Sequence, residues 1–138
     1  MRILLLYSSQ PKLVEWARVL QGELENQNCR VELAVAGAQD GNPVSAGQYS
    51  LIVVLSPFRG WWRPIIPTEI DNLLKRCSRL DGKKGVALVP TRFGSGKALK
   101  FLMHLMEVQG VLVEDFATIR SQKDLSKIAD RMLRLVKS

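Results

Sequence analysis

Aromatic and cationic side chains alternate between residues 58 and 63 of this 138-residue sequence. Phe58, Trp61 and Trp62 fall within five residues and are interleaved with Arg59 and Arg63. Aromatic rings can hold a planar ligand by stacking, and cations can hold an anion or a ring edge. Packing against a following helix, or a subunit interface, would use the same residues. We favour ligand contact, because two adjacent tryptophans in one loop rarely both point into the same core.

A second stretch has groups that can bind an anion. Ser8 and Ser9 stand just before Gln10 and Pro11, where a helix is expected to begin. Backbone N–H groups and hydroxyls at a helix start bind negative charge, which the helix dipole favours, and Lys12 adds a positive charge. Simple capping of the helix by Ser9 explains the same residues equally well.

The third stretch, residues 91–97, reads TRFGSGK but is not a phosphate-binding P-loop. That motif needs a glycine five residues before its Gly-Lys pair and a serine or threonine after the lysine. Thr91 and Ala98 occupy those two positions. The glycines can still expose N–H groups to an anion or to the edge of a ring, and a plain tight turn is an equal alternative.

The sequence lacks the residues that several other kinds of functional site require. The one histidine, His104, lies within a predicted helix beside Met103 and fits a structural or surface residue better than a base. With one histidine and no cysteine cluster, a zinc site or a Ser-His-Asp triad has little support. No G-x-G-x-x-G motif follows the first strand, which argues against the usual dinucleotide site. Serines rather than aspartates follow the strands, which argues against a phosphoacceptor receiver domain.

Predicted strands and helices alternate along the chain and must position these three stretches. Apolar runs predict buried strands at Ile3 to Tyr7, Leu51 to Leu55 and Gly85 to Val89, and Val111 to Ile119 supplies a fifth strand. Alternating polar and apolar residues at Arg30 to Val35 predict a strand nearer the sheet edge. Helical spacing of apolar residues predicts helices that begin at Pro11, after Pro67 and after Gly96, and a last one over Leu125 to Val136. The loop-like stretch from Gly37 to Tyr49 has no clear helical pattern, and Cys77 is expected on the apolar face of the second helix.

This alternation predicts a single α/β domain over residues 1–138. Its parallel sheet is expected to be doubly wound, with five strands in the flavodoxin-like order 2-1-3-4-5. The direction of winding then reverses between strands one and three. Ligands bind at that switch point, where residues 8–10 would meet residues 56–62, with residues 91–96 beside them.

Composition limits the compartment and the partners. The formal net charge is +7, and it belongs to residues 70–138, because residues 1–69 carry six basic and six acidic side chains. A solvated basic face is favoured over a nucleic-acid surface, since no stretch combines dense basic charge with aromatics. Cys29 and Cys77 are expected as reduced core thiols. Without a signal peptide or a membrane span, we expect a soluble cytoplasmic protein.

Three segments in this order resemble the flavodoxin family. YSS at residues 7–9 is similar to the start of its phosphate loop. YSLIVVLSPFRGWWRP at residues 49–64 resembles the Y-D-x-I-x-x-G-S-P segment. LDGKKGVALVPTRFGSG at residues 80–96 resembles the L-x-G-K-K-x-A-x-F strand and loop. The first loop is about one residue shorter than in the family, and Pro11 removes an N–H donor. Family electron carriers are also typically acidic, whereas this chain is basic.

The resemblance implies that FMN is the cofactor, with its phosphate in the first stretch and its isoalloxazine ring between the other two. It places the phosphate at Ser8, Ser9 and Gln10, where Lys12 would partly compensate for the shortened loop. It places the ring against residues of the second and third stretches: Ser56, Pro57, Phe58 and Trp61, and Thr91, Arg92, Phe93 and Gly94.

Two functions follow from this comparison. The first is binding of FMN, or of another anionic planar ligand, for electron transfer with a redox protein partner or for a simple flavin-dependent reduction. The alternative is a binding module that keeps the fold without FMN and uses its basic second half for an anionic partner. The resemblance alone leaves open whether the chain is an enzyme.

Overall fold

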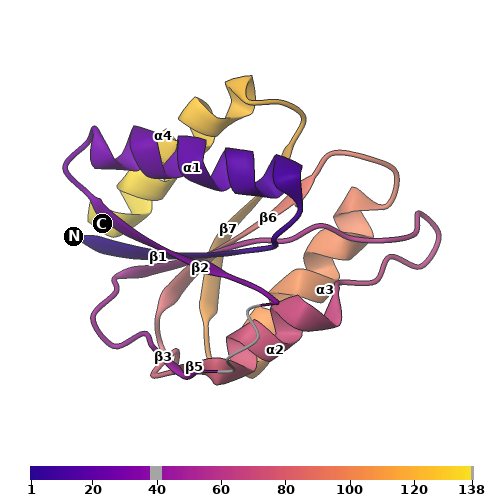
Figure 1. The fold of residues 1–138 in the computed structure, drawn as a ribbon, viewed down its shortest axis with the longest axis horizontal. Helices are drawn as coiled ribbons and strands as arrows, with labels where there is room; N and C mark the ends of the chain where they lie inside the picture. The colour runs from indigo at the N-terminus through magenta and orange to yellow at the C-terminus, as the bar shows by residue number, and fades with distance from the viewer. Residues whose placement is uncertain (38–41, 138) are drawn as a thin grey trace.

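A computed structural model describes residues 1–37 and 42–137 as an α/β sandwich around one parallel sheet (Figure 1). The sheet has the order β2-β1-β4-β6-β7. Its strands are β1 (Arg2–Tyr7), β2 (Arg30–Val35), β4 (Leu51–Leu55), β6 (Lys84–Pro90) and β7 (Leu112–Ile119). Counted along the chain, this is the predicted order 2-1-3-4-5, so the predicted fold class is confirmed.

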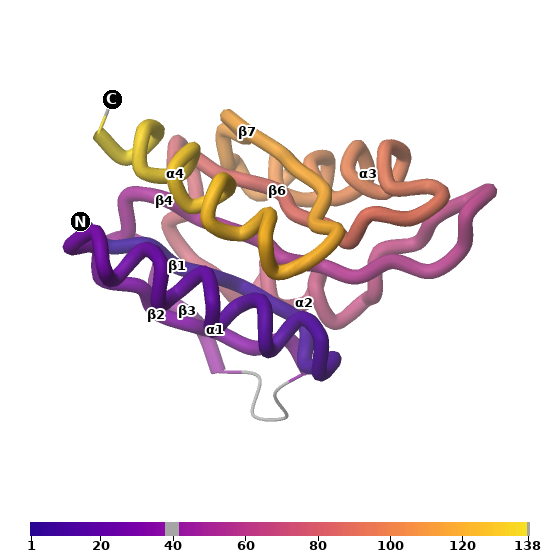
Figure 2. Tube along the Cα trace, turned by 90° about the horizontal axis from the view of Figure 1, so that it is seen from above, coloured from indigo at the N-terminus to yellow at the C-terminus, as the bar shows by residue number. Residues whose placement is uncertain are grey.

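Two helices cover each face of the sheet, as Figures 1 and 2 show. On one face lie α1 (Pro11–Glu25) and α4 (Lys123–Lys137), and on the other lie α2 (Thr68–Arg76) and α3 (Ser95–Val108). Strand β4 is buried at every residue because it lies in the middle of the sheet. Leu51, Val53 and Leu55 face the α1 and α4 side, whereas Ile52 and Val54 face the α2 and α3 side. The carboxyl ends of β1, β4 and β6 are thereby fixed beside one another.

The crossover between β2 and β4 contains a short strand. β3 (Val44–Ser45) pairs in parallel with β5 (Cys77–Ser78) to form a small second sheet. Part of the loop predicted from Gly37 onward, residues 38–41, lies outside the described residues. Cys77 was expected on the apolar face of the second helix, but it adopts extended backbone in β5, because α2 ends at Arg76. Both cysteines are buried free thiols.

Side chains occupy the backbone groups at one residue, Phe116, on the outer edge of β7. The backbone N–H of Phe116 donates to Asp115 Oδ1 at 2.8 Å, and its carbonyl accepts from Arg131 of α4 at 3.1 Å. The Arg131 guanidinium also binds both carboxylate oxygens of Asp115. In a parallel ladder one residue's N–H and C=O point to the same side, so both edge groups of Phe116 are occupied.

The helices of residues 1–37 and 42–137 include none long and apolar enough to cross a membrane.

Candidate switch-point site

Three loops meet at the carboxyl edge of the sheet. The first loop (residues 8–10) joins β1 to α1, the second (residues 56–67) joins β4 to α2, and the third (residues 91–94) joins β6 to α3. A crevice of about 310 Å³ lies between the first two loops. Its walls are Gln10 from the first loop and residues from the second loop and the start of α2: Pro57, Phe58, Arg59, Ile65, Pro67, Thr68 and Glu69. An open crevice therefore lies at the predicted switch point.

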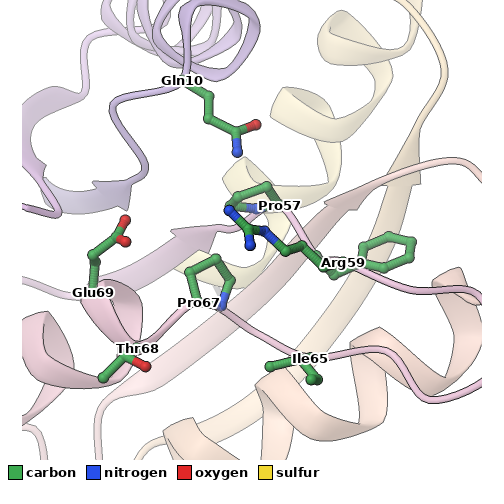
Figure 3. A pocket seen from close by; sticks show the side chains of 8 residues that line it. Gln10, Pro57, Arg59, Ile65, Pro67, Thr68 and Glu69 are labelled. Atoms are coloured by element: carbon green, nitrogen blue, oxygen red, sulfur yellow. The ribbon is translucent and has the colours of Figure 1, made fainter.

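One cationic side chain, Arg59, and one anionic side chain, Glu69, line the crevice (Figure 3). The guanidinium of Arg59 lies beside Pro57 and Pro67, and the Gln10 amide points toward it from the start of α1. The carboxylate of Glu69 projects into the same space from α2. Among the described residues, Arg59 makes no side-chain hydrogen bond or ion pair, so its five N–H donors are available to a ligand.

The first loop is short because α1 begins at Pro11. Gln10 is the N-cap residue of α1, and no side chain caps the helix, so capping by Ser9 does not occur. The Gln10 N–H donates to Ser8 Oγ at 3.3 Å, while the N–H groups of Leu13 and Val14 both donate to the Gln10 carbonyl. Pro11 has no N–H. Ser8 is buried, whereas Ser9 and Lys12 are exposed.

Two residues at the start of the second loop are turned into the protein. Ser56 is fully buried and donates its hydroxyl to the Pro57 carbonyl at 2.8 Å, so it stabilises the end of β4. Phe58 is 2% exposed, and the Arg92 guanidinium of the third loop lies 4.7 Å from its ring centre. One face of Phe58 is thus covered by the protein's own cation.

The second loop continues as a projecting hairpin, residues 59–65. Arg59 and Ile65 exchange two backbone hydrogen bonds, of 3.1 and 2.8 Å, and Gly60 has φ +82° at the turn. Figure 2 shows this segment extending beyond the end of α3, away from the sheet. Trp61 and Trp62 are 66% and 65% exposed, and their rings meet edge to face with centres 5.9 Å apart. Neither tryptophan lines the crevice.

The third loop packs directly on this hairpin. Gly94 has φ +93°, and a Cβ there would lie 3.0 Å from the Trp61 carbonyl oxygen and 3.1 Å from Trp61 Cα. The Ser95 hydroxyl accepts the Arg92 N–H at 2.7 Å and lies 2.9 Å from the Pro90 carbonyl oxygen, which fixes the turn. Phe93 is 86% exposed. The backbones of Trp61 and Gly94 are therefore in contact.

The fold of this chain is similar over almost its whole length to the folds of solved flavodoxins. Flavodoxin 1 from Bacillus cereus superimposes with a TM-score of 0.70, at 18% identity, covering 99% of this chain and 98% of that one. A mutant of flavodoxin from Pseudomonas aeruginosa gives a TM-score of 0.74, at 15% identity, covering 100% of both chains. The fold is flavodoxin-like.

Part of a larger protein has a similar fold. This chain superimposes on 36% of the rubredoxin oxygen:oxidoreductase from Desulfovibrio gigas, with a TM-score of 0.69 at 18% identity over 99% of its own length. No protein-family model matches the sequence, and a search of curated proteins gives no significant match. The similarity thus confirms the flavodoxin-like fold expected from the three sequence segments.

The flavodoxin-like fold brings together only part of the predicted residue set. Gln10, Pro57 and Phe58 line one crevice, with Ser8, Ser9 and Lys12 in or next to the first loop. Ser56 is enclosed, and the side chains of Trp61 and Phe93 lie outside the crevice with Thr91 exposed. Arg59, Thr68 and Glu69 line the crevice but were not among the predicted site residues. The signal for Arg59 was its position directly after Phe58.

The described residues fit FMN at the phosphate end of the crevice. Arg59 and the Gln10 amide offer cationic and hydrogen-bonding groups to a phosphate, while Glu69 opposes it. Ser9 and Lys12 do not line the crevice, and Lys12 Nζ lies 5.8 Å from the centre of the Trp16 ring. Pro57 and Ile65 supply an apolar wall for a ring, with the buried Phe58 behind them. Between the second and third loops the fit is poor, because the Trp61 and Gly94 backbones leave no room for a ring between them.

Proposed function

We propose that this flavodoxin-like chain binds FMN in the switch-point crevice and acts in electron transfer. The observation that carries the proposal is the 310 Å³ cavity between the first and second loops, into which the unpaired Arg59 guanidinium projects. Its position at the switch point of a doubly wound sheet is where such folds bind ligands. Bound FMN would supply the one- and two-electron chemistry.

The protein's residues have two tasks in this proposal. Arg59 binds the phosphate directly and replaces donors that Pro11 and the short first loop do not provide, while Lys12 adds positive charge nearby from the first turn of α1. Pro57 and Phe58 exclude water from one side of the ring. The basic surface then selects an acidic redox partner, since complementary charge raises the rate of association.

The visible absorbance of the freshly purified protein tests this proposal first, followed by titration with FMN and with riboflavin. We expect flavin bands or saturable micromolar binding, with FMN bound more tightly because only FMN carries the phosphate. Arg59→Gln should weaken FMN binding by about tenfold to a hundredfold, as loss of a charge-assisted hydrogen bond does, and riboflavin binding much less.

Arg63→Gln is the matched control, because it removes the same charge from the same loop at a residue outside the crevice. It should leave FMN affinity within about twofold of the wild type. Equal losses for FMN and riboflavin in Arg59→Gln would remove the phosphate role of Arg59. A colourless protein that takes up neither flavin would reject the cofactor.

A second candidate function has its own supporting observation. The contact between Gly94 and the Trp61 backbone closes the space between the second and third loops, and Arg92 covers one face of Phe58. Both favour a flavodoxin-like binding module that works without FMN. Under this alternative the protein binds no flavin, and the exposed hairpin is the functional surface.

A further inference from the structure

We propose that the tip of the hairpin is a docking surface for an anionic lipid membrane. The surface consists of Trp61, Trp62 and Arg63 on the hairpin, with Phe93 of the third loop and Lys97 and Phe101 of α3 beside them. Both tryptophans and Phe93 are mostly exposed, and Phe101 is 55% exposed one helical turn after Lys97. The inference does not depend on FMN binding.

The hairpin contacts both α3 and the third loop. Lys97 Nζ lies 3.4 Å from the Trp62 carbonyl oxygen and 5.3 Å from the centre of the Trp62 ring. Gly94 supports the other side of the tip at the Trp61 backbone. Residues fixed in advance lose little conformational entropy on binding, so exposed aromatic rings held this way are suited to docking.

The chain segments that form the tip and its surroundings carry basic side chains and no acidic ones. Residues 41–68 and 82–106 contain no aspartate or glutamate, yet they supply Arg63 and Arg92 near the tip and Lys97 and Lys100 on α3. An anionic partner is therefore favoured. Basic side chains near an anionic leaflet each add about 1 kcal/mol to membrane attraction.

The shape of the surface favours a membrane over the other anionic partners. The hairpin that carries the two tryptophans projects beyond α3 in the Cα trace (Figure 2), so its tip can enter the headgroup layer while the rest of the protein stays outside it. Tryptophan is enriched at membrane–water interfaces because its ring is apolar and its N–H is polar. A single-stranded nucleic acid needs ring faces free for stacking, and the edge-to-face arrangement of Trp61 and Trp62 covers part of one.

Sedimentation with lipid vesicles tests the proposal, using the protein without added flavin. Vesicles of phosphatidylcholine mixed with phosphatidylglycerol should bind the protein and shift its tryptophan emission to shorter wavelength, whereas pure phosphatidylcholine should bind it much less. Replacing both tryptophans (Trp61→Ala with Trp62→Ala) should lower partition by more than about tenfold. Arg63→Gln should lower it about fivefold, and less at high salt.

Leu112→Ala with Phe116→Ala is the control, since it removes two exposed apolar side chains from β7, remote from the hairpin, and should preserve vesicle binding. No sedimentation with anionic vesicles, or equal sedimentation of the double tryptophan variant, would overturn the proposal. The proposal would also be overturned if the wild type formed a dimer and the double tryptophan variant were monomeric. The same holds if the tryptophans were needed for binding to single-stranded DNA or polyglutamate and the protein did not bind vesicles. A failure to bind FMN would leave the vesicle result unaffected.

Discussion

At the scale of single residues, two buried side chains keep their protons over an extended pH range. Burial raises the pKa of the Cys77 thiol to about 11. Burial and the nearby charge of Glu32 raise the pKa of Tyr49. Both groups therefore favour the folded state in their neutral forms, and this contribution is complete below the pKa of the unfolded chain. It is lost as the pH rises through the pKa of the folded state.

We predict that Cys77→Ala flattens the alkaline part of the stability profile. Between about pH 8.5 and 11 the wild type should lose stability on the order of 2 kcal/mol through this thiol, and the variant should not. The variant should be less stable at pH 7, because a smaller side chain leaves a cavity. Denaturant unfolding from pH 7 to 11 measures both effects.

Cys29→Ala serves as the control for the cavity, because it removes another buried thiol and leaves Cys77 in place. It should also lower the free energy of unfolding at pH 7. A Cys77→Ala profile as steep as that of the wild type would assign the alkaline loss to other groups, with Tyr49→Phe as the next variant to measure.

In the candidate site, the sequence could predict which residues are present but not the direction of their side chains. The serines after the strands were visible in the sequence, but the direction of each hydroxyl was not. Ser56 follows a central strand and is completely enclosed, so its hydroxyl binds the Pro57 carbonyl. Whether the predicted set contacts FMN stays a prediction.

At the scale of elements, β7 shows how an edge strand is protected. Asp115 and Arg131 occupy the backbone groups of Phe116, and Phe116 is itself 52% exposed. Because an open edge recruits other strands, we expect this small cluster to hinder edge-to-edge association.

We predict that Arg131→Ala promotes association more than it lowers stability. An exposed ion pair contributes only about 0.2–1 kcal/mol, so the melting temperature should change little. The freed Phe116 carbonyl, next to the exposed Phe116 ring, should instead produce dimers or aggregates at high concentration. Light scattering over a concentration series measures this association.

Arg134→Ala is the matched control, because it removes the same charge from an exposed position one turn along α4. It should scatter light like the wild type. An Arg131→Ala protein that stays monomeric at all concentrations would contradict the protective role of this cluster.

Element prediction succeeded where the pattern is local. The run Leu51 to Leu55 is apolar, is rich in β-branched residues and is followed by Ser56 and Pro57. Strand β4 begins and ends at the predicted residues, Leu51 and Leu55. The β3 and β5 pair escaped prediction because two residues from each of two distant segments carry no periodicity. The hairpin also escaped, since its form depends on the Arg59–Ile65 backbone pairing and on the support from Gly94.

At the scale of the whole molecule, two apolar layers lie on opposite faces of one sheet. Leu20 of α1 belongs to one layer and Leu102 of α3 to the other, and both are fully buried. The strands of the sheet contribute to both layers, so we expect the layers to unfold together as a single domain.

We predict that Leu20→Ala and Leu102→Ala each lower the free energy of unfolding by about 2–5 kcal/mol. Their effects should add to within about 0.5 kcal/mol, because the side chains do not touch. In each variant, circular dichroism and the fluorescence of the buried Trp16 should report one transition with the same midpoint. Trp61→Phe with Trp62→Phe provides the background for the fluorescence.

Two separated midpoints in any variant would contradict the single domain predicted over residues 1–138. The sequence could predict this architecture because every central strand is apolar on both faces, which requires helices on both sides.

The backbone hydrogen bonds between Arg59 and Ile65 also separate a segment that is free to change in evolution from the buried scaffold. Residues 61–63 lie beyond that pairing, and the side chains of Trp61, Trp62 and Arg63 contribute nothing to the apolar layers. Substitutions there can accumulate at little cost to folding, whereas Phe58 and Ile66 on either side are buried and constrained. The tip can therefore change its target while the scaffold stays the same, and divergence among homologues should be greatest across these three positions.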